Sequence, residues 1–275
     1  MSEAGAGDIA RAVEEDDAVV LLDYVRTMGR LGFAPQAEAI AVAGGWAIFT
    51  GPGDPLNRTA GLGLAGPTRP ADLDRVEAFY RRLGSPPRVE ACDPTDPGLR
   101  AMLEARGYSL QHALRVYALE IEPSAGPAAA DPAPGVEVAR VGPQDYERWA
   151  RTVTHGFTGA EAGPEFERGL RLGRTACRRD GVLCYLARVE GEDAGGGALD
   201  ASRTRGHLFS MVTLPVFRRR GVQSAVLRAR VDAARTLGCA QVVVKVNADS
   251  DSERNVRRAG FQLAYSKVCM TLDNT

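Results

Sequence analysis

The stretch Val212-Thr-Leu-Pro-Val-Phe-Arg-Arg-Arg-Gly-Val-Gln-Ser-Ala-Val-Leu227 decides how the chain folds. A strand stops before Pro215, a loop carries three arginines and Gly221, and an amphipathic helix is expected from Ser224 to Leu237. The first N–H groups of a helix lack intrahelical acceptors and carry the positive end of its dipole, so they favour an anion. Gly221 lets the backbone approach a phosphate, and Ser224 is suited to capping the helix. The stretch therefore predicts a pyrophosphate-binding loop, with a solvated basic turn as the alternative.

Hydrophobic patterns on both sides of this loop predict a mixed α/β fold. In the second half we expect strands at 136–141, 181–189, 194–199, 207–214, 241–246, 261–265 and 268–272, and helices at 145–157, 164–178, 224–237 and 252–259. In the first half, where the pattern is weaker, we expect helices at 16–31, 70–83 and 99–106, and strands within 39–50 and at 114–121. Both halves thus alternate between strands and helices.

A segment rich in proline, alanine and glycine, residues 123–135, separates the two halves. It has no hydrophobic periodicity and too little apolar bulk for a core, so we interpret it as a linker. The predicted domains are 1–122 and 136–275, each large enough to hold a core. The octapeptides 103–110 (LEARGYSL) and 256–263 (VRRAGFQL) occupy matching places near the ends of the halves, which indicates an internal duplication.

Composition excludes several classes of protein. Of the 275 residues, 44% are hydrophobic and 25% are charged, which excludes a disordered, collagen-like or disulfide-stapled chain. No apolar run reaches the roughly 18 residues that a membrane span needs, and residues 1–8 lack the basic flank and apolar core of a secretion signal. We therefore expect a cytoplasmic protein with no membrane partner, whose five scattered cysteines form neither disulfides nor a metal site.

The loop and the elements around it resemble the GNAT acyltransferase superfamily. The pyrophosphate loop of that superfamily follows the pattern (Gln/Arg)-x-x-Gly-x-(Gly/Ala), and residues 218–223 (RRRGVQ) match it except at Gln223. A side chain of that size must point away from the phosphate. The later motif of the family, a strand, a helix and Gly260-Phe261, is present as well. The resemblance covers 136–275 and implies two GNAT-like domains, each a mostly antiparallel mixed sheet flanked by helices, of which the first is degenerate and lacks a cofactor loop.

What the resemblance implies is an N-acyltransferase that moves acetyl from acetyl-CoA, or another acyl group from its acyl-CoA, to an amine by direct attack. The strand ending at Thr213 would then pair with pantetheine, the loop amides would hold the pyrophosphate, and a backbone N–H near Val212 would stabilise the oxyanion. The cofactor-binding residues implied in this way are Met211, Val212, Thr213, Arg218, Arg219, Arg220, Gly221, Val222, Gln223, Ser224, Asn247 and Asn255.

The catalytic residues are marked less clearly than the loop. Many family members have a tyrosine acid in the last helix, and the aligned residue here is Val256, which cannot transfer a proton. Three candidates remain: Tyr265 on the following strand, Glu253 at the start of the last helix, and His155, a residue type suited to general base catalysis. Each has a structural alternative, namely a buried tyrosine with a satisfied hydroxyl and charges that favour their own helix ends.

Two other functions compete with acyl transfer. A non-catalytic acyl-CoA-binding module is the first, since Val256 occupies the position of the usual acid. A nucleic-acid-binding protein is the second, but the pI of about 6.4 and the lack of a recognised motif argue against it. The amine acceptor, on a small molecule or a protein, and the oligomeric state are not indicated by the sequence.

Overall fold

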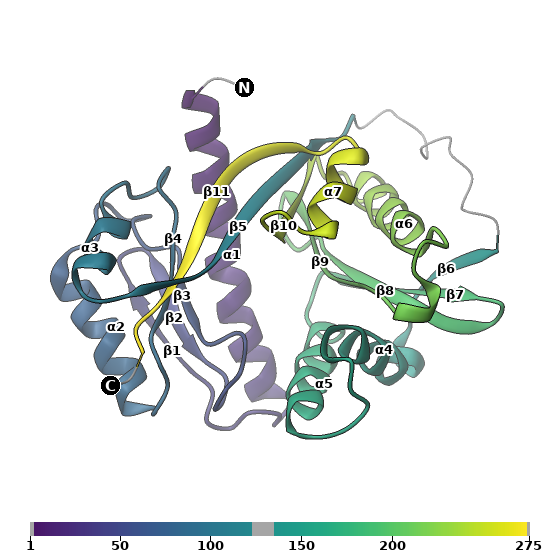
Figure 1. Ribbon diagram of the computed structural model, residues 1–275, viewed down its shortest axis with the longest axis horizontal. Helices are drawn as coiled ribbons and strands as arrows, with labels where there is room; N and C mark the ends of the chain where they lie inside the picture. The colour runs from purple at the N-terminus through teal and green to yellow at the C-terminus, as the bar shows by residue number, and fades with distance from the viewer. Residues whose placement is uncertain (1–2, 123–134, 274–275) are drawn as a thin grey trace. The chain divides into compact units, whose positions relative to one another are not determined.

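The computed structural model describes residues 3–122 and 135–273 (Figure 1). It contains two compact units: unit 1 comprises Met1–Tyr117, Val246–Arg254 and Leu263–Thr275, and unit 2 comprises Ala118–Lys245 and Asn255–Gln262. The predicted linker lies outside the described residues except for residue 135. Two segments of the predicted second domain pack with unit 1, so its boundary in space differs from its boundary along the sequence.

Unit 1 contains a sheet whose strands follow the order β1-β2-β3-β4-β11-β5 (Figure 1). Its elements are α1 (Glu3–Arg30), β1 (Glu38–Val42), β2 (Gly45–Phe49), β3 (Arg58–Ala60), α2 (Pro70–Arg82), β4 (Arg88–Ala91), α3 (Leu99–Ala105), β5 (Ser109–Glu120) and β11 (Gln262–Thr271). Leu73, Val76 and Tyr80 of α2 lie in its core because they recur at helical spacing on one face.

The last strand of the chain belongs to the sheet of unit 1. β11 pairs antiparallel with β4, with Val268 opposite Ala91 and Thr271 opposite Arg88. The prediction of two separate strands at 261–265 and 268–272 is wrong, because residues 262–271 form one continuous strand. The predicted helix at 16–31 also begins earlier, at Glu3.

Unit 2 contains a sheet of order β10-β9-β8-β7-β6, and its elements confirm the predicted α/β order. They are β6 (Val136–Arg140), the short 3-10 helix η1 (Pro143–Asp145), α4 (Tyr146–Thr158), α5 (Pro164–Ala176), β7 (Val182–Val189), β8 (Glu192–Asp200), β9 (Arg205–Thr213), the 3-10 helix η2 (Pro215–Phe217), α6 (Val222–Thr236), β10 (Gln241–Asn247) and α7 (Asp251–Arg258). The end of β10 and the first half of α7, within Val246–Arg254, belong to unit 1. Neighbouring strands from β6 to β9 are antiparallel, and β9 and β10 are parallel.

Helices α4 and α6 cover opposite faces of strand β8. A Cβ added to Gly196 would meet Trp149 of α4, whereas a Cβ added to the next residue, Gly197, would meet Arg230 of α6. Successive Cβ positions of a strand point to opposite faces of the sheet, so the two helices lie on different sides. Among the described residues, no helix is both long enough and apolar enough to cross a membrane.

Candidate functional site

Two residues of the loop between β9 and α6 adopt the left-handed backbone conformation. Arg219 has φ 61° although it is not glycine, and Gly221 has φ 84° and precedes the first residue of α6. Buried Val222 opens the helix, so α6 begins two residues before the predicted start at Ser224. The prediction that Ser224 caps the helix is therefore wrong: Gly221 occupies the capping position, and Ser224 lies in the first turn.

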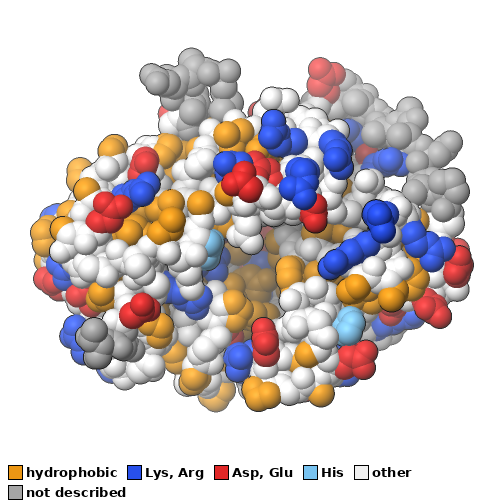
Figure 2. Space-filling view, viewed as in Figure 1, with side chains coloured by type: hydrophobic (Ala, Val, Ile, Leu, Met, Phe, Trp, Pro, Cys, Tyr) orange, Lys and Arg blue, Asp and Glu red, His pale blue; other side chains and the backbone are white. Residues whose placement is uncertain are grey.

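Three exposed arginines precede the N-terminus of α6, and two of them are free to meet a ligand. Arg220 is engaged, since it pairs with Glu190 at 2.6 Å and lies over the ring of Phe217. Within the described part of the chain, Arg218 and Arg219 form no ion pair. Figure 2 shows basic side chains gathered over α6 and α7 on the visible face. Together with the unpaired N–H groups of the first helical turn, these charges favour an anion.

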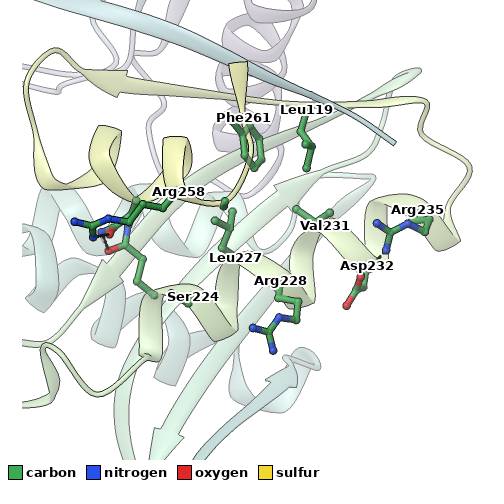
Figure 3. A pocket seen from close by; sticks show the side chains of 12 residues that line it. Leu119, Ser224, Leu227, Arg228, Val231, Asp232, Arg235, Arg258 and Phe261 are labelled. Atoms are coloured by element: carbon green, nitrogen blue, oxygen red, sulfur yellow. Dashed lines mark hydrogen bonds and ion pairs between the residues drawn. The ribbon is translucent and has the colours of Figure 1, made fainter. Parts of the chain in front are cut away.

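A cavity of about 500 Å³ lies beside α6 and α7, within the range of small-molecule sites. Figure 3 shows Phe261 and Leu119 across the cavity from the side chains of α6. Its lining residues are Leu119, Gln223, Ser224, Leu227, Arg228, Val231, Asp232, Arg235, Asn255, Arg258, Ala259 and Phe261. The lining combines apolar side chains with amides and arginines, and one of these arginines, Arg235, pairs with Asp232 at 2.6 Å. Such a lining suits a ligand that has both apolar and polar parts.

Gln223 and Asn255 meet at the edge of this cavity. The Asn255 side-chain amide donates to Oε1 of Gln223 at 2.5 Å, and Arg258 donates to Oδ1 of Asn255 at 3.3 Å. The Gln223 side chain is thus directed toward α7, which is consistent with the requirement that it leave the loop backbone clear. Asn247 lies at the exposed end of β10, where its carbonyl accepts a hydrogen bond from Ser250.

Strand β9 is paired to β10 over only part of its length. The parallel register runs from Arg205 opposite Gln241 to Leu208 opposite Val244, and β9 then continues to Thr213. The buried hydroxyl of Thr213 has no hydrogen-bond partner among the described residues. An unpaired buried hydroxyl costs free energy, so a polar ligand group at this end of β9 would stabilise it.

A bulge interrupts the other edge of β9. The pairing with β8 shifts between Ala198 opposite Phe209 and Gly196 opposite Val212, which leaves Ser210 and Met211 facing one residue of β8. Ser210 has φ 53°, a left-handed conformation that non-glycine residues rarely adopt. A bulge leaves the extra residue unpaired and redirects its backbone groups.

Three consecutive glycines of β8 face this bulged region, a feature that was not among the sequence-based predictions. Added Cβ atoms would lie 2.4 Å from the Val212 carbonyl at Gly195, 2.9 Å from the Tyr185 carbonyl at Gly196, and 2.9 Å from Cζ of Arg230 at Gly197. A run of glycines inside a strand often indicates a bulge or the close approach of other groups. This triplet could therefore have predicted the irregular pairing of β8 with β9.

His155 lies near the end of α4, which packs against β9. A Cβ at the neighbouring Gly156 would be 2.7 Å from Cβ of Val212, so the helix and the strand are in tight contact. The His155 ring nitrogen Nδ1 is 3.1 Å from the carbonyl of Ala160. A proton on Nδ1 donated to that carbonyl leaves Nε2 as an acceptor, which is the arrangement of an oriented general base.

The contacts of Tyr265 favour its structural alternative. Its hydroxyl is buried in unit 1 and donates to Glu14 at 2.6 Å. Burial and the Glu14 carboxylate raise the pKa of Tyr265 well above its usual value. The same carboxylate accepts from Lys267 at 3.0 Å, so Tyr265 belongs to a buried charge cluster.

The contacts of Glu253 are also those of a structural residue. Its carboxylate accepts from the hydroxyl of Tyr117 at 2.5 Å, from Arg115 at 2.7 Å and from the backbone N–H of Asp249 at 2.6 Å. The hydrogen bonds from Tyr117 and Arg115 lower the pKa of Glu253 to about 2. A carboxylate this acidic is a weak base near neutral pH.

We expect Glu253→Gln to lower stability at neutral pH. The lowered pKa means that the charged form stabilises the fold above the unfolded value of about 4.3, and that this contribution is lost as the pH falls toward 2. Urea unfolding at pH 7 and pH 3 should therefore show a larger difference from the wild type at pH 7. Glu161→Gln is the control, because that side chain is 85% exposed. An equal difference at both pH values would contradict the assignment.

Comparisons with known proteins agree with this geometry. Residues 146–261 match the acetyltransferase (GNAT) family. A GCN5-related N-acetyltransferase from Kribbella flavida has the same fold, with a TM-score of 0.66 and 18% identity over 94% of this chain and 96% of that protein. A tandem GNAT protein from the clavulanic acid biosynthesis pathway has a TM-score of 0.56 and 17% identity over 82% of this chain and 73% of its own.

A third solved structure, a GCN5-related N-acetyltransferase from Sphaerobacter thermophilus, has a TM-score of 0.54 and 20% identity. That match covers 68% of this chain and 59% of the other protein. No curated protein sequence matches the chain.

Proposed function

We propose that the protein, whose residues 146–261 match the acetyltransferase (GNAT) family, is an acyl-CoA-dependent N-acyltransferase that uses acetyl-CoA. The observation that supports this proposal is the start of α6, where the exposed Arg218 and Arg219 precede the left-handed Gly221 and the first N–H groups of the helix, a combination that favours an anion. The cavity along α6 begins at Gln223 and Ser224, directly after this loop. An anionic group at the loop and an apolar arm or ring in the cavity together match the chemistry of coenzyme A.

The residues present fit such a ligand. The amides of residues 219–224 would hold the pyrophosphate, and Met211, Val212 and Thr213 would pair with the pantetheine arm. The unpartnered hydroxyl of Thr213 supports this placement, since pantetheine carries amides that could bond to it. Asn247 and Asn255 would supply further polar contacts. Acetyl-CoA itself supplies an activated acyl group, so the protein has mainly to orient it.

The proposed reaction is direct attack by an amine on the thioester carbonyl carbon. The C–N bond forms, the C–S bond breaks, coenzyme A leaves as a thiolate, and the amine loses one proton while the thiolate gains one. Of the three catalytic candidates we retain His155 as the base, because its ring is oriented and α4 packs against β9. Tyr265 and Glu253 are assigned to the structure of unit 1.

The first unit is proposed to be a degenerate GNAT-like domain that binds no cosubstrate. Its strand β3 is followed by a glycine-rich loop and helix α2, the same order as β9, loop and α6. Two carboxylates of the chain already occupy the start of α2. Asp72 accepts from the N–H of Arg69 at 3.0 Å, and Asp96 accepts from the N–H of Thr68 at 2.8 Å. Negative charge at this place opposes a phosphate.

Arg218→Ala and Arg219→Asn are expected to weaken acetyl-CoA binding by about 1–2 kcal/mol each, the size of a charge-assisted contact. Asparagine is chosen at position 219 because it tolerates the left-handed backbone found there. Calorimetry would measure both affinities at low and high salt, and the difference from the wild type should shrink as salt screens the charges. Arg203→Ala is the control, since Arg203 is exposed and precedes the opposite end of β9. Unchanged affinity in both variants would remove the loop from the site.

Turnover separates the enzyme from the non-catalytic binding module. With bound acetyl-CoA and a panel of small amines and amine-bearing peptides, an enzyme releases the coenzyme A thiol in step with acceptor acetylation. The binding module would bind acetyl-CoA at one site per chain and release no thiol with any acceptor. His155→Gln should then lower the transfer rate while leaving acetyl-CoA affinity unchanged.

A further inference from the structure

Arg230 is a buried cation in the middle of α6. It is 2% exposed, and its partners are uncharged. Nε donates to the carbonyl of Val226, Nη1 donates to the carbonyls of Ala198 and Phe209, and Nη2 contacts Sδ of Met211, all at 3.2–3.3 Å. Within the described residues, no carboxylate pairs with Arg230.

Burying an unpaired charge costs free energy, so we expect Arg230 to have a specific role that offsets this cost. Burial lowers the pKa of Arg230, yet a guanidinium remains protonated at neutral pH because its ordinary pKa is so high. A leucine or methionine on α6 would fill the same space without this penalty. The contacts of Arg230 show which part of the fold it stabilises.

Those contacts surround the bulge of β9. Ala198 and Phe209 are the last regular pair before the register shifts, and Met211 lies within the bulge itself. The guanidinium packs on Gly197, the residue of β8 that faces the extra residue of β9. Arg230 therefore ties β8, α6 and both sides of the bulge with one rigid, planar group.

We propose that Arg230 is the positioning residue that fixes the bulge of β9, so that backbone N–H groups at Met211 and Val212 face the acyl carbonyl of the bound thioester. This inference rests on the proposed acyl transfer. Arg230 neither gives nor takes a proton and does not touch the substrate. Its guanidinium holds the strand on both sides of the bulge through the carbonyl of Phe209 and the sulfur of Met211.

Arg230→Met and Gly197→Ala test the proposal from two sides. Methionine removes the fork and the charge, while alanine at position 197 displaces the guanidinium without changing Arg230. The probe is acetyl-CoA labelled with ¹³C at the thioester carbonyl, whose infrared stretch moves to lower frequency when N–H groups polarise it. We expect the wild type to show this shift and both variants to lose most of it. Both should bind coenzyme A, which lacks the acyl group, within about twofold of the wild type, because the loop at Gly221 is untouched.

Transfer to an active amine should fall roughly 10- to 100-fold in kcat, less than the roughly 100- to 1,000-fold loss seen when an oxyanion donor is removed outright, because here the N–H groups are displaced and not removed. KM for acetyl-CoA should change little. Arg230→Lys should behave like Arg230→Met, since a single ammonium nitrogen cannot occupy the separate positions of Nε, Nη1 and Nη2. Arg203→Met is the control for the substitution. An unchanged carbonyl shift in a folded variant overturns the proposal, and so does a parallel loss of coenzyme A affinity, which would indicate general collapse.

Hydrogen exchange in the ligand-free protein keeps this test independent of the proposed function. If the wild type binds no acetyl-CoA, the acyltransferase proposal fails. The exchange rates of backbone amides in the regular pairing on either side of the bulge, at Phe209 and Leu214, still report on whether Arg230 fixes the bulge. These rates should rise at least tenfold in Arg230→Met and Gly197→Ala relative to those of β7. Unchanged rates there would overturn the role of Arg230.

Discussion

Replacing Gly221 by aspartate is expected to abolish acetyl-CoA binding, while asparagine at the same position preserves most of it. Gly221 has φ 84° directly before α6. Asparagine and aspartate both tolerate this left-handed conformation better than other side chains and have nearly the same size. The pair therefore isolates charge from strain. Like charges 4 Å apart repel by about 4 kcal/mol at the effective dielectric of a protein surface, which corresponds to roughly a 1,000-fold loss of affinity.

We expect the aspartate variant to be at least as stable as the asparagine variant although it binds less tightly. A loss of affinity caused by charge can therefore be distinguished from unfolding. A carboxylate at the N-terminus of a helix interacts favourably with the dipole and caps the first N–H groups. Gly221→Asp should therefore unfold at the same temperature as Gly221→Asn or above it, although it no longer binds the ligand. Calorimetry and thermal unfolding of the two variants would check this. Equal affinity of the two variants would exclude the start of α6 as the phosphate site.

The order of elements around the candidate site could be predicted from sequence, because it depends on local patterns. A strand, an arginine-rich loop with Gly221 and an amphipathic helix follow one another within 16 residues, and the structure places them as expected. The exact helix start was missed because Arg219 adopts a left-handed turn, which is rare for arginine and leaves no mark in hydrophobic periodicity. The same patterns placed most strands and helices of unit 2 within a few residues.

Features that join distant segments were not predictable in this way. β11 pairs with β4, from which it is separated by about 180 residues, and no local pattern selects that partner. Tyr265 looked like a substitute acid because its contact with Glu14, 251 residues away along the chain, could not be inferred from spacing. The position of Arg230 beside the bulge likewise depends on the packing of α6 against the glycines of β8. By contrast, the three glycines were visible in the sequence and could have indicated a close approach.

Lys267→Met is expected to destabilise unit 1 severely. The ammonium of Lys267 is completely buried and lies 2.6 Å from Glu90, 2.8 Å from Glu14 and 3.2 Å from Asp17. Without it, Glu90 keeps its ion pair with Arg58 at 2.8 Å and Glu14 keeps the hydrogen bond from Tyr265 at 2.6 Å, but all three carboxylates lose the buried ammonium. Removing one partner of a buried ion pair typically costs about 3–5 kcal/mol, so the free energy of unfolding should fall by at least this amount. Lys245→Met, at the only other lysine of the chain, is the matched control.

The dependence of this effect on pH follows from the charges. Burial alone would lower the pKa of Lys267, but the carboxylates of Glu14, Glu90 and Asp17 raise it well above its usual value. A raised pKa means that the charged lysine stabilises the fold fully below the unfolded value of about 10.4, and that this contribution is lost as the pH rises beyond it. The wild type should therefore lose stability in alkali more steeply than Lys267→Met. Adding Glu14→Gln should partly rescue Lys267→Met at pH 7, because it removes one of the stranded charges, although the same change alone should destabilise the wild type. Additive effects of the two substitutions in urea unfolding would show that the cluster does not act as a unit.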